Sequence, residues 1–114
     1  DDLWVEQHDR CHAVGCYQKF THQWNIQNRG RCLWNGRKLV CINQNEVKPQ
    51  FVPLTIDIPE TKPLEFIKIT TEADSRGIEG SYNCVWEMQD SNGNNCFPDS
   101  RLVFDFAVNV TFKA

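Results

Sequence analysis

The chain has 114 residues, with 12 Lys or Arg against 15 Asp or Glu, a net charge of -3 and an isoelectric point near 5.5. This length is close to the commonest domain size, so we expect a single domain over residues 1–114. The acidic balance and dispersed basic residues argue against a nucleic-acid partner, and no apolar run approaches the roughly 20 residues of a membrane helix. We therefore expect neither nucleic-acid binding nor membrane insertion.

Six cysteines form an even set in this short chain. That composition favours a disulfide framework and an oxidising compartment, while buried free thiols are the competing interpretation. A metal cluster is a further alternative, but the spacing of its ligands matches no common zinc site, so we predict no metal and no cofactor. Those ligands are His8, Cys11, His12 and Cys16.

The first half of the chain predicts three strands. A short apolar run at residues 3–5 is a candidate edge strand, and Cys11 and Cys16 are expected to close a small loop after it. Residues 20–28 alternate strictly between two faces, which is the period of a half-buried strand. Glycine-containing turns then lead to another strand at 38–42. The apolar face of strand 20–28 comprises Phe20, His22, Trp24 and Ile26.

The second half predicts four more strands. Residues 51–58 alternate but contain Pro53, which lacks a backbone donor, so this strand is expected at a sheet edge. Residues 64–71 are rich in β-branched side chains. The runs 81–89 and 102–112 also alternate, and an Asn-Gly turn lies between them. About seven short strands with regular turn signals predict an antiparallel β-sandwich.

The tryptophans divide into core and surface candidates. Trp24 and Trp86 are in phase with the other apolar residues of their strands, so we expect them to be buried. Trp34 instead lies on a connection beside Arg31 and Arg37, a composition typical of protein-contact hot spots. The predicted core comprises Trp24, Tyr82, Trp86, Phe104 and Phe106.

No catalytic pattern is present in the sequence. The three histidines fall in the first quarter of the chain, and His22 is in phase with the core face. The chain has no nucleophile elbow, phosphate loop or paired-carboxylate motif. We therefore predict that the protein is not an enzyme.

Asn109 begins an Asn-Val-Thr sequence, which is a candidate N-glycosylation site. It falls on the polar face of the last predicted strand, where a glycan has room. The site can be used only if the protein passes through a eukaryotic secretory pathway.

Aromatic, glycine and cysteine residues also follow a recognisable order. In the first half they are Phe20, Trp24, Asn28, Gly30, Cys32 and Trp34, and in the second half Gly80, Tyr82, Trp86, Gln89, Asp90 and Gly93. In this order the chain resembles, over about residues 18–110, the four-tryptophan (FW) domain, the immunoglobulin-like central domain of the autophagy receptor family called neighbour of the breast-cancer gene. The resemblance implies a non-catalytic β-sandwich that binds other proteins. In fungal receptors this module captures vacuolar hydrolase cargo.

The cysteines set the chain apart from cytosolic members of that family, which favours an extracellular relative. Cysteine pairing is not fixed by sequence, but the spacing of Tyr82 and Cys84 matches the tyrosine corner of immunoglobulin-like domains. This match points Cys84 inward, on a strand expected to neighbour the one that carries Cys41. The hypothesis is three disulfides, joining Cys11 with Cys16, Cys32 with Cys96, and Cys41 with Cys84.

These observations predict an immunoglobulin-like antiparallel β-sandwich of about seven strands, stapled by disulfides. We expect a secreted or cell-surface module for protein interaction or structure, within a homo- or hetero-oligomeric assembly. One alternative is a cytosolic cargo-binding domain of a selective autophagy receptor with reduced thiols. Another is a secreted lipid-binding sandwich, which is disfavoured because bulky residues such as Trp24 and Phe106 should fill the space between the sheets.

Overall fold

The computed structural model describes residues 1–100 and 102–112. Over these residues it contains ten strands and one 3-10 turn (η1, Gln44–Glu46). Over these residues no helix is long and apolar enough to cross a membrane. The strands are β1 (Leu3–Gln7), β2 (Cys11–Gly15), β3 (Lys19–Asn28), β4 (Lys38–Cys41), β5 (Gln50–Val52), β6 (Thr55–Asp57), β7 (Phe66–Asp74), β8 (Gly80–Cys84), β9 (Trp86–Gln89) and β10 (Phe106–Thr111).

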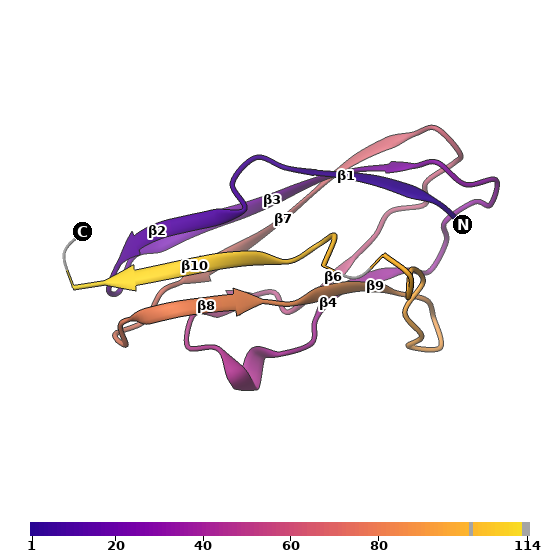
Figure 1. Cartoon of the computed structure of the whole chain (residues 1–114). Helices are drawn as coiled ribbons and strands as arrows, with labels where there is room; N and C mark the ends of the chain where they lie inside the picture. Colours follow the sequence, from indigo (N-terminus) through magenta and orange to yellow (C-terminus); the bar gives the residue numbers. More distant parts are fainter. Residues whose placement is uncertain (101, 113–114) are drawn as a thin grey trace.

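The strands form two layers, as in an immunoglobulin-like sandwich (Figure 1). One layer is an antiparallel sheet in the order β1-β3-β7-β5. The other contains two three-stranded sheets, β2-β10-β8 and β6-β4-β9. Only Val85 separates β8 from β9, so one length of chain joins these two sheets edge to edge.

The N-terminal segment contributes a strand to each layer. β1 pairs antiparallel with β3, and after a three-residue break β2 pairs parallel with β10. The predicted small loop closed by Cys11 and Cys16 is therefore wrong. Five extended residues span about 16 Å, far beyond the roughly 4–7 Å between the Cα atoms of a disulfide.

The other predicted disulfides are also not formed, and all six cysteines are free. Cys41 lies directly opposite Trp86 in the antiparallel ladder, so Cys84 is its diagonal neighbour. Diagonal Cα atoms lie about 7–8 Å apart, which is too far for a disulfide. Cys32 is exposed between β3 and β4, and Cys96 is half-buried with its N–H donated to Met88 O. The structure therefore does not support disulfide stapling.

Two predicted strands have different limits. The run 51–58 divides around Pro53 into β5, which pairs with β7, and β6, which pairs with β4. Both pieces are edge strands, as expected. The last strand begins only at Phe106, because residues 102–104 form a turn in which Leu102 has a positive φ of 72°. The alternation of apolar residues predicts a strand from residue 102 onward, but residues 102–104 form this turn instead.

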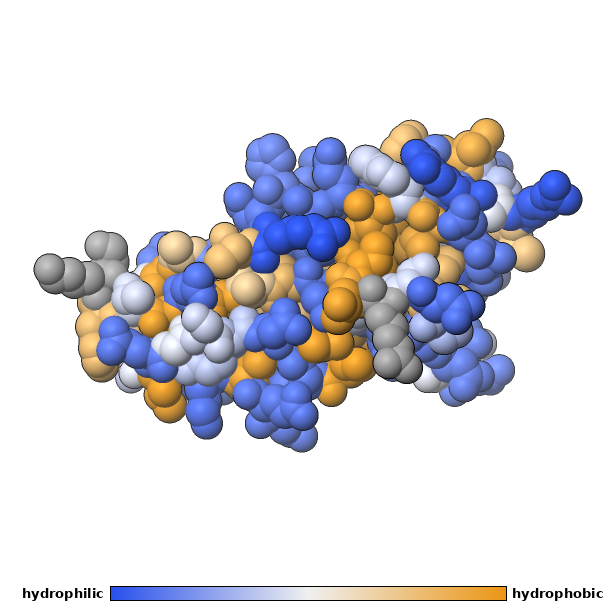
Figure 2. All heavy atoms as spheres, in the orientation of Figure 1, coloured by the Kyte–Doolittle hydropathy of each residue, from blue (hydrophilic) through white to orange (hydrophobic). Residues whose placement is uncertain are grey.

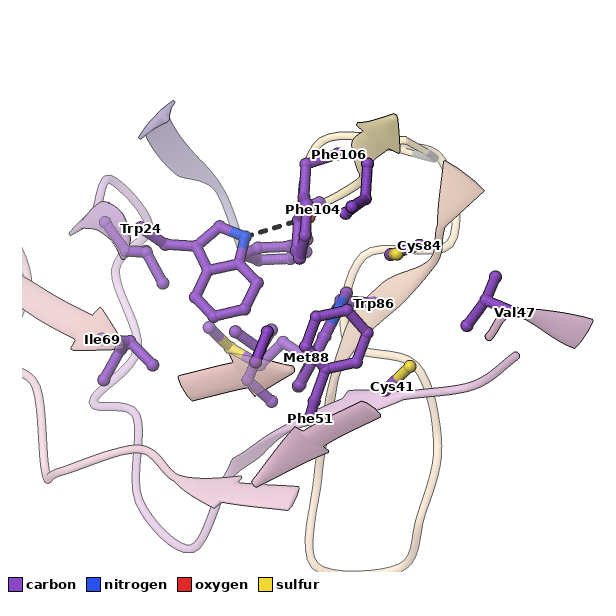
Figure 3. Packing of buried hydrophobic residues seen from close by; sticks show 14 of the residues in the cluster. Trp24, Cys41, Val47, Phe51, Ile69, Cys84, Trp86, Met88, Phe104 and Phe106 are labelled. Atoms are coloured by element: carbon purple, nitrogen blue, oxygen red, sulfur yellow. Dashed lines mark hydrogen bonds between the residues drawn. The ribbon is translucent and has the colours of Figure 1, made fainter. Parts of the chain in front are cut away.

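The core lies between the layers and is rich in aromatic side chains (Figure 3). Trp24 and Trp86 have ring centroids 5.0 Å apart, and the Trp24 Nε1–H donates to Phe104 O over 2.9 Å. Phe51 and Phe106 pack edge-on nearby, so side chains fill the space that a lipid carrier would need. Trp24, Trp86, Phe104 and Phe106 are all buried.

Tyr82 differs from these core residues because it is only half-buried. Its hydroxyl donates to Ile78 O over 2.9 Å, four residues upstream, and Cys84 follows two residues later. This is the geometry of the tyrosine corner. The corner anchors the start of β8, where Gly80 has a φ of 155° that favours glycine.

Candidate functional site

A hollow of about 360 Å³ lies between β9 and the segment that leads into β10. It forms because β10 pairs with β8 but not with β9, so irregular chain covers that side of β9. The hollow is lined by Ile42, Val85, Trp86, Glu87, Asn95, Phe97, Ser100, Leu102, Phe104 and Asp105.

The turn after β9 fixes the start of the covering segment. Asp90 Oδ1 accepts hydrogen bonds from the N–H groups of Asn92 and Asn94, and Gly93 supplies a positive φ of 82°. The backbone N–H of Asn94 is the main cause of a lowered pKa at Asp90. Asn95 then bridges back to Gln89, so this wall of the hollow is held against the strand.

A buried carboxylate is the main polar feature of the hollow. Asp105 Oδ1 accepts the backbone N–H of Trp86 over 3.2 Å. Asp105 Oδ2 is buried and makes no hydrogen bond within the described residues, although the Asn83 side chain lies near enough to lower the pKa of the carboxyl. Burial is the larger effect and raises that pKa. A buried acceptor without a partner is uncommon in folded proteins and is costly to leave so.

Apolar side chains form the outer rim of the hollow. Leu102 is 66% exposed and Ile42 is 51% exposed. Ile42 directly follows β4, and Leu102 lies on the segment before β10. Figure 2 shows hydrophobic atoms gathered near the middle of one face of the molecule. An apolar rim around a buried hydrogen-bond acceptor is the composition of a binding pocket for a side chain or a chain terminus.

The predicted contact residues are placed differently from one another. Trp34, a candidate protein contact by its sequence neighbours, is fully buried and has no surface to offer a partner. Its backbone bonds to Thr61 in both directions, and its ring contacts Phe97 in the wall of the hollow. The guanidinium carbon of Arg37 lies 5.5 Å from the Trp34 ring centroid. Arg37 Nη2 also forms an ion pair with Asp1 Oδ2 at 3.0 Å, which neutralises the charge of Arg37 within the chain. Arg31 is exposed.

Sequence reasoning missed the hollow itself. Asp105 interrupts a run of apolar residues, and alternation places it on the polar face of a strand. No local signal marked its burial, because alternation places a residue between two core aromatics, Phe104 and Phe106, on the solvent face of a strand. The exposure of Leu102 had no local signal either.

Two of the three histidines, His12 and His22, form a network of polar contacts with Gln7. His12 Nε2 lies 2.8 Å from His22 Nδ1, and His22 Nε2 lies 2.7 Å from Gln7 Oε1. Burial, and secondarily His12, lowers the pKa of His22 to about 3. Among the described residues no three His, Cys, Asp or Glu side chains are placed to hold a metal ion.

Asn109 lies on β10, the middle strand of its sheet, and is half-buried. Its Oδ1 accepts the Ser81 hydroxyl over 2.7 Å, and its Nδ2 lies 3.2 Å from Cys11 Sγ. Glycosylation would have to displace both contacts and therefore stays a prediction.

Comparison with protein families gives a match over most of the chain. The model of a family described as "Ig-like domain from next to BRCA1 gene" matches residues 9–108. A search of curated proteins gave no match.

Proposed function

Because the chain belongs to the family of Ig-like domains from next to BRCA1 gene, we propose that it is a non-catalytic protein-binding module whose contact surface is the hollow beside β9. The observation that carries this proposal is Asp105 Oδ2, a buried acceptor that has no hydrogen bond among residues 1–100 and 102–112 and lies below an exposed apolar rim. A partner group that donates to this oxygen would remove the cost of its burial.

The partner chemistry follows from the lining. Leu102 and Ile42 offer an apolar contact, and Asp105 accepts a hydrogen bond or a positive charge. We propose a partner segment that inserts one N–H or O–H donor between the two apolar side chains. The remaining contact area would come from the surrounding face, because a specific protein interface buries about 800 Å² on each partner.

The finer family assignment is the four-tryptophan type, and three tryptophans support it by lying in the core. They are Trp24, Trp34 and Trp86. This type implies a cytosolic cargo-binding domain of a selective autophagy receptor. Six free thiols agree with a reducing compartment, so we propose the cytoplasmic location in place of the extracellular one.

The test is partner capture by the purified domain with a variant of the rim. Leu102→Asn removes the apolar contact but keeps the backbone, because asparagine tolerates the positive φ of 72°. Tyr17→Asn is the matched control, since Tyr17 is also highly exposed and has a positive φ of 56°, but lies between β2 and β3. Partners from a cytosolic extract are quantified by mass spectrometry.

We expect Leu102→Asn to lose the partners that the wild-type domain enriches, and Tyr17→Asn to retain them. Asp105→Asn should also weaken capture, because its amide oxygen keeps the N–H of Trp86 and its amide nitrogen, in place of Oδ2, cannot accept a donor from the partner. Unchanged capture by Leu102→Asn would reject the hollow as the contact surface.

A further inference from the structure

A second surface lies on the outer face of the other layer and is formed by three adjacent strands. In the register of the sheet, Trp4 on β1 is opposite Gln27 on β3, and Gln27 is opposite Phe66 on β7. Trp4 and Phe66 meet edge to face with ring centroids 6.0 Å apart. Together with Arg29 and Leu64 these side chains form what we call the Trp4 patch.

Hydrogen bonds hold the polar part of the patch in place. Gln27 is buried, and its Nε2 donates to Leu64 O over 3.2 Å. Arg29 Nε donates to Gln27 Oε1 over 2.7 Å, and its guanidinium lies 5.7 Å from the Trp4 ring centroid. The Arg29 head group is therefore oriented through Nε, while its other nitrogens remain for a ligand.

The charge of Arg29 is not neutralised within the described residues, where the one ion pair joins Arg37 to Asp1. Three acidic residues of the adjoining segments accept hydrogen bonds from neutral N–H groups and form no ion pair with Arg29 among the described residues. Asp2 Oδ1 accepts the N–H of Leu3, Glu65 Oε1 accepts the N–H of Lys62, and Glu6 Oε1 accepts from Asn25. Lys68, one row further along the sheet and exposed, adds a second positive charge.

The apolar part of the patch is unusually exposed. Phe66 is 65% exposed and Leu64 is 72% exposed. A tryptophan in contact with both an exposed phenylalanine and an oriented arginine has the composition of a protein-contact hot spot. An arginine fork binds a carboxylate through two parallel hydrogen bonds, which sets the chemistry of the occupant.

We propose that the Trp4 patch binds an acidic peptide segment in which a carboxylate side chain neighbours a large apolar side chain. The carboxylate pairs with Arg29, and the apolar side chain packs on Phe66 and Leu64. This surface belongs to the β1-β3-β7-β5 layer, so it is separate from the hollow beside β9 and independent of the function proposed for it.

The experiment is selection of phage-displayed random heptapeptides on the purified domain, run in parallel on Arg29→Gln, Phe66→Ser and Arg76→Gln. Arg76 is the control because it is an exposed arginine that follows β7 at the other end of the same layer. Thermal melts verify that each variant is folded.

We expect the wild type and Arg76→Gln to enrich peptides that pair Asp or Glu with Phe, Leu or Trp. Arg29→Gln and Phe66→Ser should not enrich them, and one synthesised winner should bind Arg29→Gln at least about ten-fold more weakly. The same peptide with amides in place of carboxylates should lose a similar factor.

Three results would overturn the proposal. One is the absence of acidic-apolar enrichment, and another is enrichment that persists in Arg29→Gln. The third is a wild-type dimer in sedimentation velocity that Phe66→Ser dissociates, because the patch would then bind a second copy of the chain.

Discussion

His12 Nε2 lies 2.8 Å from His22 Nδ1, and this contact fixes the protons of a buried chain of three side chains. Gln7 Nε2 donates to the carbonyls of Val103 and Asp105, so Gln7 Oε1 faces His22 as an acceptor. His22 must therefore donate from Nε2 and, when neutral, accept at Nδ1 from His12. A proton added at His22 Nδ1 would meet the N–H of His12, and it has no acceptor there.

The first prediction is a loss of stability in mild acid. His22 has a folded pKa near 3 against about 6.5 unfolded, so below pH 6.5 the unfolded chain binds the extra proton. Stability is therefore fully present above pH 6.5 and is lost as pH falls toward 3, by up to about 1.4 kcal/mol per pH unit for one proton. Burial also lowers the pKa of His12, which adds in the same direction.

Urea unfolding between pH 7.5 and 4.5 measures this slope. His22→Phe keeps the stack on Phe106, whose ring lies 3.6 Å away, and should flatten the slope while lowering stability at pH 7.5. His8→Asn changes an exposed histidine and should leave the slope as in the wild type. An equal slope in His22→Phe would show that the histidine chain does not control acid sensitivity.

The second prediction concerns the thiols. Denatured protein alkylated without reductant should carry six labels, because all six cysteines are free. In the native state the exposed Cys11 and Cys32 should react first. Burial raises the pKa of Cys84 to about 12 and also raises that of Cys41, so these two should react last. Fewer than six labels on denatured protein from a reducing cytosol would contradict the structure.

The third prediction is that Tyr82→Phe destabilises the domain by about 1 kcal/mol. The change removes only the hydroxyl that donates to Ile78 O, and a hydrogen bond of this kind has a net value of that order. Tyr17→Phe is the control, because the structure gives the Tyr17 hydroxyl no hydrogen bond among the described residues. Chemical denaturation measures the free energy of unfolding of both variants. If Tyr82→Phe and Tyr17→Phe are equally stable, the hydrogen bond of the tyrosine corner does not stabilise the domain.

Much of the layer arrangement could be predicted from alternation. Strand β3 has one face toward the core because Trp24 and Ile26 recur at the strand period, and the edge position of residues 51–58 followed from the missing donor of Pro53. These signals are local. The division of that run between two sheets depends on which strands lie on either side, and no local pattern records it.

The site depended on non-local geometry. The arginines beside Trp34 make it a candidate protein contact, yet its side chain is buried and its backbone pairs with Thr61, far along the chain. Cysteine number suggested disulfides, but pairing depends on ladder register, which places Cys41 opposite Trp86. Composition therefore identified the fold class better than it identified any contact.

The last prediction is that Asp105→Asn makes the domain more stable relative to the wild type as pH rises from 4 to 7.5. Burial raises the pKa of Asp105 in the folded state, so the folded chain holds its proton more tightly than the unfolded chain does. The stabilising effect of that proton is present at low pH and is lost as pH rises through the folded pKa, which is opposite in sign to the effect of His22. The amide oxygen of asparagine still accepts the N–H of Trp86, so the turn into β10 should survive.

Unfolding free energies of Asp105→Asn, with the exposed Asp99→Asn as control, are compared across this range. A difference that shrinks with rising pH would mean that Asp105 is better solvated, or better paired, than its buried position beside β9 implies.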